Sequence, residues 1–174
     1  LVGKRPISER PQHVENREQL GHWEIDTVMG GRSKDCIVTL VERKSGNVLI
    51  GKLRNRTKEE LNKRVIKMIQ GSGLTFISIT ADNGTEFHGY KEIEHATGVK
   101  FYFATPYHSW ERGTNENTNG LIRQYLPKRK SMASLTQSQC DNIAYTLNTR
   151  PRERHDFRTP LEVCQGLARV ALQM

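Results

Sequence analysis

The spacing of apolar positions divides the chain into strand-like and helix-like segments. Residues 22–29 alternate with a period of two, so neighbouring side chains point to opposite faces of a predicted strand that carries Asp26. The mostly apolar run at 35–43 is typical of a central strand covered on both faces. After a turn, residues 48–55 return as a third strand. The pattern predicts a three-stranded antiparallel meander.

The segments that follow predict a strand–helix–strand crossover. A capping box at Thr57 opens a helix that Gly73 ends, and the apolar residues 74–82 form a short strand with Asp82 at its end. Such crossovers are almost always right-handed. A crossover that lays this strand beside the first, and parallel to it, brings Asp82 next to Asp26. A short helix at 90–98 and a fifth strand at 99–105 come next.

Residues 105–127 predict a loop that runs into a helix with Glu116 near its start. At about 100° per residue, Asn119, Gly120 and Arg123 share the face of Glu116. The apolar residues of this segment fall on the opposite face: Leu121, Ile122, Tyr125 and Leu126. An acid, an amide, a bare backbone position and an arginine suit a phosphodiester and its metal ions. Taken alone, the pattern still favours an ordinary amphipathic surface helix.

The two ends of the chain differ in character. Residues 1–20 lack periodicity and contain two prolines, which predicts an extended arm that either crosses the domain or links it to a missing module. Residues 21–174 are enough for one domain with a sizeable core. Within them, we expect a helix at 135–148 and a last helix that opens with a second capping box at Thr159 and runs toward Met174.

The charge balance favours a polyanionic partner. Lys and Arg number 27 against 19 Asp and Glu, a net charge of +8 with a sequence pI near 9.6. No apolar run approaches the length of a membrane span and no signal-peptide pattern opens the chain, so we expect a cytoplasmic protein with no membrane partner. The three cysteines lack the spacing of a disulfide framework or a zinc site. The chain does not begin with Met, which suggests a fragment.

Three carboxylates are candidates for a metal site. Phosphoryl-transfer sites hold Mg²⁺ through a few carboxylates from different elements and leave other positions to water and phosphate oxygens. Asp26 on the first strand, Asp82 at the end of the fourth and Glu116 on the later helix fit that need. Three acids that converge in this way repel one another, and divalent cations relieve the repulsion.

The acidic segments also resemble a known family. HWEID, DNGTEF, RGTNENTNGLIRQYLPK and the 34-residue step from Asp82 to Glu116 (116 − 82) are similar to the catalytic cores of DDE transposases. More narrowly, they resemble the bacterial insertion-sequence transposases of the thirty family, which are relatives of retroviral integrases. The resemblance covers most of the chain, from ISERP near its start to RTPLEV near its end.

This resemblance implies an α/β, ribonuclease-H-like fold, in which the meander and two further strands form a five-stranded mixed sheet flanked by helices. It implies that Asp26, Asp82 and Glu116 are catalytic and hold two Mg²⁺ or Mn²⁺ ions. Water would first attack a phosphodiester at the element's end, and the freed 3′-hydroxyl would then attack target DNA. The implied partners are transposon-end and target DNA, and the active complex would be a homo-oligomer associated with the bacterial nucleoid.

Seven residues around the Glu116 helix are candidates for DNA contact: Asn115, Asn119, Gly120, Arg123, Lys128, Arg129 and Lys130. For Glu24 we favour an ion pair with a nearby arginine over a role in metal binding. For His108 we favour simple solvation over DNA contact or proton transfer. For Trp110 two interpretations are equally favoured: it packs its loop against the domain, or it stacks on, or wedges between, DNA bases.

Two other functions remain open from the residues alone. A non-catalytic DNA-binding or assembly module could derive from a transposase, although such a module has no reason to keep all three acids. A structure-selective nuclease of the same fold would cleave DNA without strand transfer.

Overall fold

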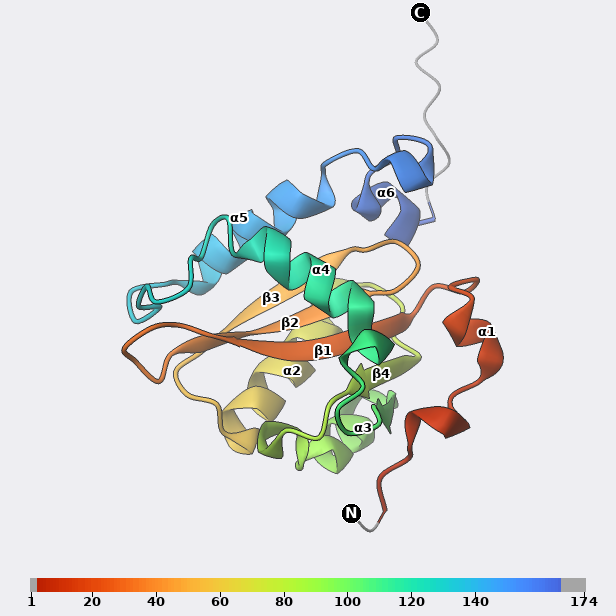
Figure 1. The fold of residues 1–174 in the computed structure, drawn as a ribbon, viewed down its shortest axis with the longest axis horizontal. Helices are drawn as coiled ribbons and strands as arrows, with labels where there is room; N and C mark the ends of the chain where they lie inside the picture. The colour runs from red at the N-terminus through yellow and green to blue at the C-terminus, as the bar shows by residue number, and fades with distance from the viewer. Residues whose placement is uncertain (1–2, 167–174) are drawn as a thin grey trace, which may run out of the picture.

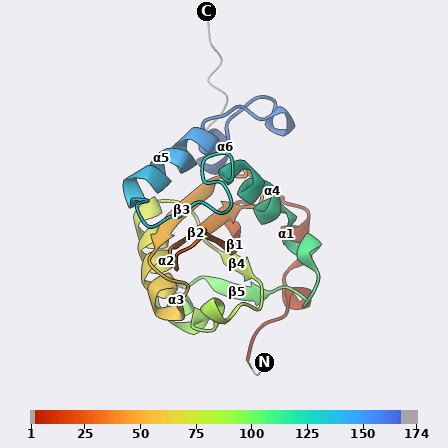
Figure 2. The same ribbon diagram turned by 60° about the vertical axis from the view of Figure 1, so that its left-hand side comes forward.

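A computed structural model of the chain describes residues 3–166. One five-stranded mixed sheet forms its centre, in the order β3-β2-β1-β4-β5 (Figures 1 and 2). The strands are β1 (His22–Met29), β2 (Cys36–Glu42), β3 (Val48–Leu53), β4 (Ser78–Ala81) and β5 (Lys100–Phe103). The predicted antiparallel meander is confirmed in β1–β2–β3, and β4 lies parallel to both β1 and β5. Every residue of β2 is buried, as expected for the central covered strand.

Helices cover both faces of this sheet (Figure 1). On one face, α2 (Lys58–Ser72) and α3 (Tyr90–Thr97) pack over a core that includes Trp23, Leu40 and Phe101. On the other face, α4 (Gly113–Ile122) and α5 (Gln137–Asn148) pack over a second core. Among the helices of residues 3–166, none has both the length and the apolar character that crossing a bilayer requires.

Local capping explains where these helices begin and end. The Thr57 side chain accepts a hydrogen bond from the Glu60 backbone at the start of α2, and Gly73 ends the helix in the left-handed conformation at φ 67°. Helix α5 opens with a complete capping box at Thr136. The Thr159 capping box is also confirmed and opens α6 (Pro160–Cys164). The predicted continuation of this last helix to Met174 includes residues 167–174, which lie outside the described part of the chain.

Two predicted boundaries were wrong. Residues 1–20 were expected to be extended, yet they include a 3-10 helix, η1 (Ile7–Glu9), and a short helix, α1 (Gln12–Glu15). The helix of Glu116 begins at Gly113, so Glu116 lies in its first turn as predicted, but the helix ends sooner than predicted, at Ile122. Tyr125 and Leu126 therefore lie in the turns beyond α4, because a residue that precedes a proline, here Pro127, disfavours the helical conformation.

The N-terminal segment lies across the domain. Phe103 of β5 donates a backbone hydrogen bond to Arg5 (2.9 Å), and Pro6 forms an isolated parallel bridge with the same strand residue. Farther along the segment, the Arg10 guanidinium is buried, donates to Thr80 of β4 at 2.9 Å and pairs with Glu15. The segment therefore crosses the domain, which is one of the two courses predicted for it.

Candidate active site

The parallel pairing of β1 and β4 places two aspartates side by side. Glu24 pairs with Thr80 in the register of these strands, and Asp26 and Asp82 each come two residues later on their own chains. The even step keeps both aspartates on the same face as the paired residues. The structure therefore confirms the predicted proximity of Asp26 and Asp82.

One guanidinium contacts both aspartates. Arg112, the last residue of the 3-10 helix η3 (Ser109–Arg112), places Nη2 3.3 Å from Asp82 Oδ2 and Nη1 3.6 Å from Asp26 Oδ1. Nη1 also donates to the Ile25 carbonyl at 3.4 Å. The Arg112 side chain is only 14% exposed, so its charge is poorly screened by water. Sequence reasoning missed this residue, because no periodic pattern reveals where a loop arginine points.

Asp26 is oriented from both sides of its carboxylate. Oδ1 accepts a hydrogen bond from the Thr27 backbone and Oδ2 accepts one from Asn119 Nδ2, each 2.9 Å long. Burial raises the pKa of Asp26, and the neighbouring Asp82 charge raises it further. Arg112 and the two hydrogen bonds oppose this effect without cancelling it. The ionised form of Asp26 is therefore unfavourable unless a cation lies beside it.

A tight turn presents Asp82. Its Oδ1 accepts a hydrogen bond from the Gly84 backbone at 2.7 Å, and Asn83 Nδ2 donates to the Ala104 carbonyl at 2.8 Å. A Cβ on Gly84 would lie 2.5 Å from Glu86 Oε2 and 2.9 Å from Asp82 Oδ1, so a side chain there would displace both carboxylates. Asn83 and Gly84 thus shape the turn that presents Asp82.

Glu86 is a further acid beside the pair that sequence reasoning missed. It is 4% exposed, accepts a hydrogen bond from Thr27 Oγ1 at 2.8 Å and lies 3.7 Å from Arg56 Nε. The sequence feature that could have identified Glu86 is its position four residues after Asp82. Both partners contact Glu86 Oε1, and the hydrogen bond from Thr27 of β1 assigns this acid to the support of that strand.

Glu116 does not meet the two aspartates. It lies on the exposed side of α4, and Asn119, three residues later on a neighbouring part of the helix surface, is the residue that reaches Asp26. Within residues 3–166, no group of three or more His, Cys, Asp or Glu side chains is close enough to hold a metal ion. The three-acid metal site thus stays a prediction, with two of its members adjacent.

The DNA contact predicted for Asn115 is wrong, because this residue lies on the buried side of α4. Asn115 is 1% exposed and accepts a hydrogen bond from Thr39 Oγ1 at 3.3 Å, while its backbone donates to Glu24 at 2.8 Å. Because α4 rests on β1 and β2 through Asn115, Thr118 and Ile122, the Asn115 side chain faces the sheet and cannot reach DNA. The predicted ion pair of Glu24 is confirmed: its carboxylate is fully buried against Arg43.

Arg123 and Gly120 lie on the outer side of α4. Arg123 donates to the carbonyls of Met29 at 3.1 Å and Leu126 at 3.3 Å, which ties the end of α4 to the end of β1. Gly120 is exposed, and a Cβ built there would meet nothing within 4 Å. Close packing therefore does not explain this glycine. DNA contact by either residue stays a prediction.

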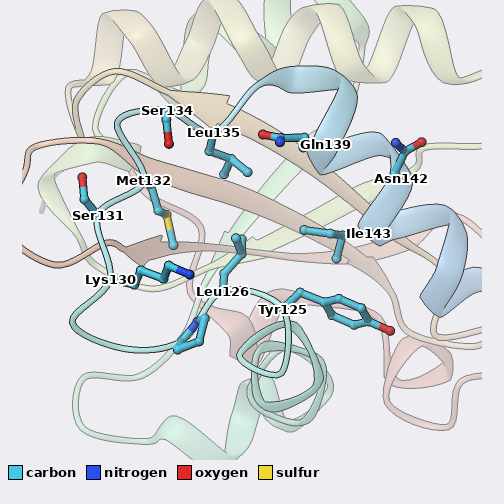
Figure 3. Close-up of a pocket in the computed structure, with 11 residues that line it drawn as sticks. Tyr125, Leu126, Lys130, Ser131, Met132, Ser134, Leu135, Gln139, Asn142 and Ile143 are labelled. Carbon is cyan, nitrogen blue, oxygen red and sulfur yellow. The ribbon is translucent and has the colours of Figure 1, made fainter.

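The basic run Lys128, Arg129 and Lys130 is exposed and caps the β1–β2 turn. Gly31 of that turn donates a backbone hydrogen bond to Lys130 at 2.9 Å, and a Cβ on Gly31 would clash with the Arg129 carbonyl. Lys130 borders a groove of about 430 Å³ between the end of α4 and α5 (Figure 3). The run is thus anchored by its backbone, and DNA contact by its side chains stays a prediction.

The loop before α4 carries exposed rings. His108 and Trp110 stack with their ring centroids 4.4 Å apart, and Trp110 is 68% exposed. The interpretation in which Trp110 packs its loop against the domain is therefore wrong, because its ring contacts a loop histidine and leaves most of its surface to solvent. His108 also lies 3.4 Å from Glu111.

Comparison with known proteins agrees with this arrangement. No family model matches the chain. It is 44% identical over 162 residues, 93% of its length, to the transposase for insertion sequence element IS4351 from Bacteroides fragilis. It is 43% identical over 166 residues, 95% of its length, to the transposase InsI for insertion sequence element IS30A from Escherichia coli. The chain spans about half the length of these relatives, 50% and 43% respectively.

Solved structures share the fold at low sequence identity. The catalytic core domain of BIV integrase superposes with a TM-score of 0.64 and 20% identity, over 83% of this chain and 93% of that one. A chain of the simian T-cell lymphotropic virus intasome, solved with the PP2A regulatory subunit B56 gamma, superposes with a TM-score of 0.68 and 17% identity, over 86% of this chain and 55% of that one. The predicted ribonuclease-H-like fold is confirmed. Over more than nine tenths of its length, the chain is therefore similar to transposases of bacterial insertion sequence elements, IS30A among them.

Proposed function

We propose that this chain is the catalytic core of a DNA transposase, which cleaves phosphodiester bonds at transposon ends and joins the freed 3′-hydroxyl to target DNA. One observation carries the proposal: Asp26 and Asp82, from adjacent parallel strands, meet around a single cationic group. The 43% identity to the transposase InsI for insertion sequence element IS30A supports the same activity. The partners are transposon-end and target DNA, and the enzyme acts as a homo-oligomer in the cytoplasm, at the nucleoid.

The adjacent carboxylates of Asp26 and Asp82 have the donor chemistry of a Mg²⁺ or Mn²⁺ site, to which Glu116 would have to be added. Carboxylate oxygens are the hard ligands that these ions prefer. The two aspartates already share one positive group, and the Asp82 side chain is 39% exposed, so the pair is open to a cation from solvent. Asp26, Asp82 and Glu116 would hold two ions. When bound, these ions supply activation of the attacking oxygen and stabilisation of the leaving oxygen in an in-line displacement.

The residues of the chain prepare this site. Thr27 and Asn119 hold the Asp26 carboxylate in one orientation, and the Gly84 turn does the same for Asp82. Arg112 balances the charge of both aspartates in the absence of a divalent ion. Glu116 completes the set from the exposed side of α4, the side on which DNA approaches. Arg123 and the Lys128–Lys130 run contact the DNA backbone without reading its sequence.

The division of the chain is part of this proposal. Residues 21–174 are the catalytic core, and residues 1–20 are an arm that leads into it. The contacts of Arg5 and Arg10 with the strands support an arm that stays attached to the core.

Nicking of a labelled terminal-repeat duplex in the presence of Mn²⁺ tests the proposal. Wild-type protein is expected to nick the duplex and to join the nicked end to a second DNA. Because Glu116 is exposed, Glu116→Gln is expected to melt at the wild-type temperature and to lose both reactions. Glu59→Gln, at an exposed acid of α2 on the other face of the sheet, serves as the matched control.

The outcomes separate the candidate functions. Cleavage without joining favours the structure-selective nuclease. DNA binding with neither reaction favours the non-catalytic module. Wild-type joining by Glu116→Gln removes Glu116 from the proposed site.

A further inference from the structure

A basic pocket lies on the flank of α4 that faces away from Asp26. Thr114, Asn117 and Thr118 of α4 line one side of it. Its other side includes Arg17 from the N-terminal segment, together with Arg152, which precedes the 3-10 helix η4 (Glu153–His155), and Arg154 within η4. Its volume is about 400 Å³. Arginines from two segments that are remote in sequence thus converge on one hollow.

These arginines are not neutralised by the protein. Within residues 3–166, no carboxylate lies within 4 Å of the guanidinium nitrogens of Arg17, Arg152 or Arg154. Backbone carbonyls hold two of them: Arg17 donates to Arg43 at 3.1 Å and Arg152 donates to Leu147 at 3.2 Å. Glu153 also borders the pocket without forming an ion pair there.

The cluster is electrostatically strained as it stands. Burial lowers the pKa of Arg154, and the charges of Arg17 and Arg152 lower it further, while Glu42 opposes the shift. Like charges gathered in this way repel one another, and an anion between them reverses the sign of that contribution. The pocket therefore favours a negatively charged ligand.

A buried hydroxyl adds a donor suited to an oxyanion. Thr114 is 7% exposed and lines the pocket, yet its Oγ1 has no hydrogen-bond partner among residues 3–166. Buried hydroxyls are nearly always hydrogen-bonded in folded proteins, so an orphan at a binding pocket points to a missing partner. The exposed Asn117 side chain supplies an amide donor at the same rim.

We propose that this pocket binds a phosphate of the DNA backbone, through the guanidinium groups of Arg17, Arg152 and Arg154 and the hydroxyl of Thr114. Arginine matches phosphate geometry with paired N–H donors, so several of them around one pocket favour a phosphodiester. The site rests on the proposed function in that DNA is its ligand. It adds a contact on the opposite flank of α4 from the aspartates, so DNA held in both places straddles this helix.

Equilibrium binding of the full chain to a fluorescent duplex, from about 50 to 200 mM salt, tests the pocket. Arg152→Ala/Arg154→Ala is expected to weaken binding about tenfold at low salt and to reduce the salt slope by about 1–2. Lys63→Ala/Lys67→Ala removes the same charge from exposed positions of α2, on the other face of the sheet, and is expected to change both quantities far less. Equal effects of the two double variants would overturn the proposal, because net charge alone would then explain them.

Two further measurements keep the result decisive. Arg17→Ala, on a different segment, is expected to weaken DNA binding in the same direction, and melting temperatures identify any variant that fails to fold. Thermal shift with inorganic phosphate distinguishes the source of the ligand. If phosphate stabilises the wild type but not Arg152→Ala/Arg154→Ala, while both bind DNA equally, the pocket takes a free anion and the DNA contact is wrong.

Failure of the proposed function is distinguishable from failure of the pocket. A wild-type protein that binds DNA through these arginines but never nicks it keeps the pocket and loses the transposase assignment. A protein that nicks DNA and binds it equally well without Arg152 and Arg154 keeps the assignment and loses the pocket.

Discussion

Asn119 and Asp26, 93 residues apart in the chain, are joined by a hydrogen bond of 2.9 Å from the side-chain amide to the carboxylate. This contact links α4 to the first strand at Asp26, beside the packing of the buried α4 residues on the sheet. Asn119 was predicted to contact DNA. In the structure, Asn119 instead orients Asp26, the aspartate that the proposed chemistry needs.

Replacement of Asn119 by Ala tests that role. The loss of the donor leaves the Asp26 carboxylate free to rotate, and the loss of a partner that orients a metal ligand typically costs about 10–100-fold in activity. We expect nicking to fall by that factor. We also expect the melting temperature to fall by only about 2–4 °C, the effect of about 1 kcal/mol in a chain of this size. Gln124→Ala, at an exposed position just beyond the helix, is the control. Unchanged nicking by Asn119→Ala would contradict the role.

Arg112 is predicted to compete with divalent cations for the two aspartates. Arg112→Ala leaves Asp26 and Asp82 without their shared positive charge, so the free energy of unfolding in EDTA is expected to fall by about 1–3 kcal/mol. The loss is small because Asp82 is partly exposed, so water screens its charge. The affinity for Mn²⁺ without DNA, measured by electron paramagnetic resonance, is expected to rise several-fold.

The control for this prediction is Arg54→Ala, which removes an exposed arginine after β3. If Mn²⁺ binds Arg112→Ala and Arg54→Ala with equal affinity, Arg112 does not occupy the cation position. The melting temperatures with and without Mn²⁺ give an independent measurement of the same competition.

The antiparallel meander was predictable from the period-two pattern of the sequence. The meeting of Asp26 with Asp82 was predicted only on the condition that the crossover lays the fourth strand beside the first, an arrangement that the family resemblance also implied. The face of α4 was less predictable. Asn115 and Asn119 are chemically alike, and only packing on β1 and β2 reveals that the first is buried and the second reaches Asp26. Arg112 and the Arg17–Arg152–Arg154 pocket depend on where long side chains from loops point, which no local pattern encodes.

His22 is predicted to make stability depend on pH. It is 4% exposed, and the neutral ring is paired with Ser78 at 2.7 Å and Gln19 at 3.0 Å. Burial lowers its pKa to about 4, and the nearby His13 and Arg10 contribute in the same direction. Between about pH 6.5 and 4, the unfolded chain therefore binds a proton at this site that the folded chain excludes.

Stability is expected to fall as the pH falls through that window, by up to about 3 kcal/mol from this residue. Denaturant unfolding of wild type and His22→Gln at pH 7, 5.5 and 4 measures the contribution. The difference between pH 7 and pH 4 should be smaller in the variant, because glutamine does not titrate. Parallel pH profiles for the two proteins would show that the acid sensitivity arises elsewhere.

Gly120 provides the sharpest test of how DNA approaches α4. Glycine within a helix costs about 1 kcal/mol relative to alanine, and the open space around this position excludes close packing as its reason. Gly120→Ala and Gly120→Leu are therefore both expected to melt at the wild-type temperature or slightly above it. If DNA passes over this surface toward Asp26 and Asp82, the leucine side chain collides with its backbone and nicking is lost.

This prediction depends on an unchanged melting temperature combined with the loss of nicking. Gln124→Leu adds the same apolar bulk at an exposed position four residues farther on, and it is expected to nick DNA at close to the wild-type rate. Gly120→Ala should retain intermediate activity, because a single methyl group reaches less far from the helix. Melting temperature and nicking are measured on the same preparation of each variant. A Gly120→Leu protein that is stable and fully active would mean that DNA does not cross this part of α4, and that the glycine is incidental.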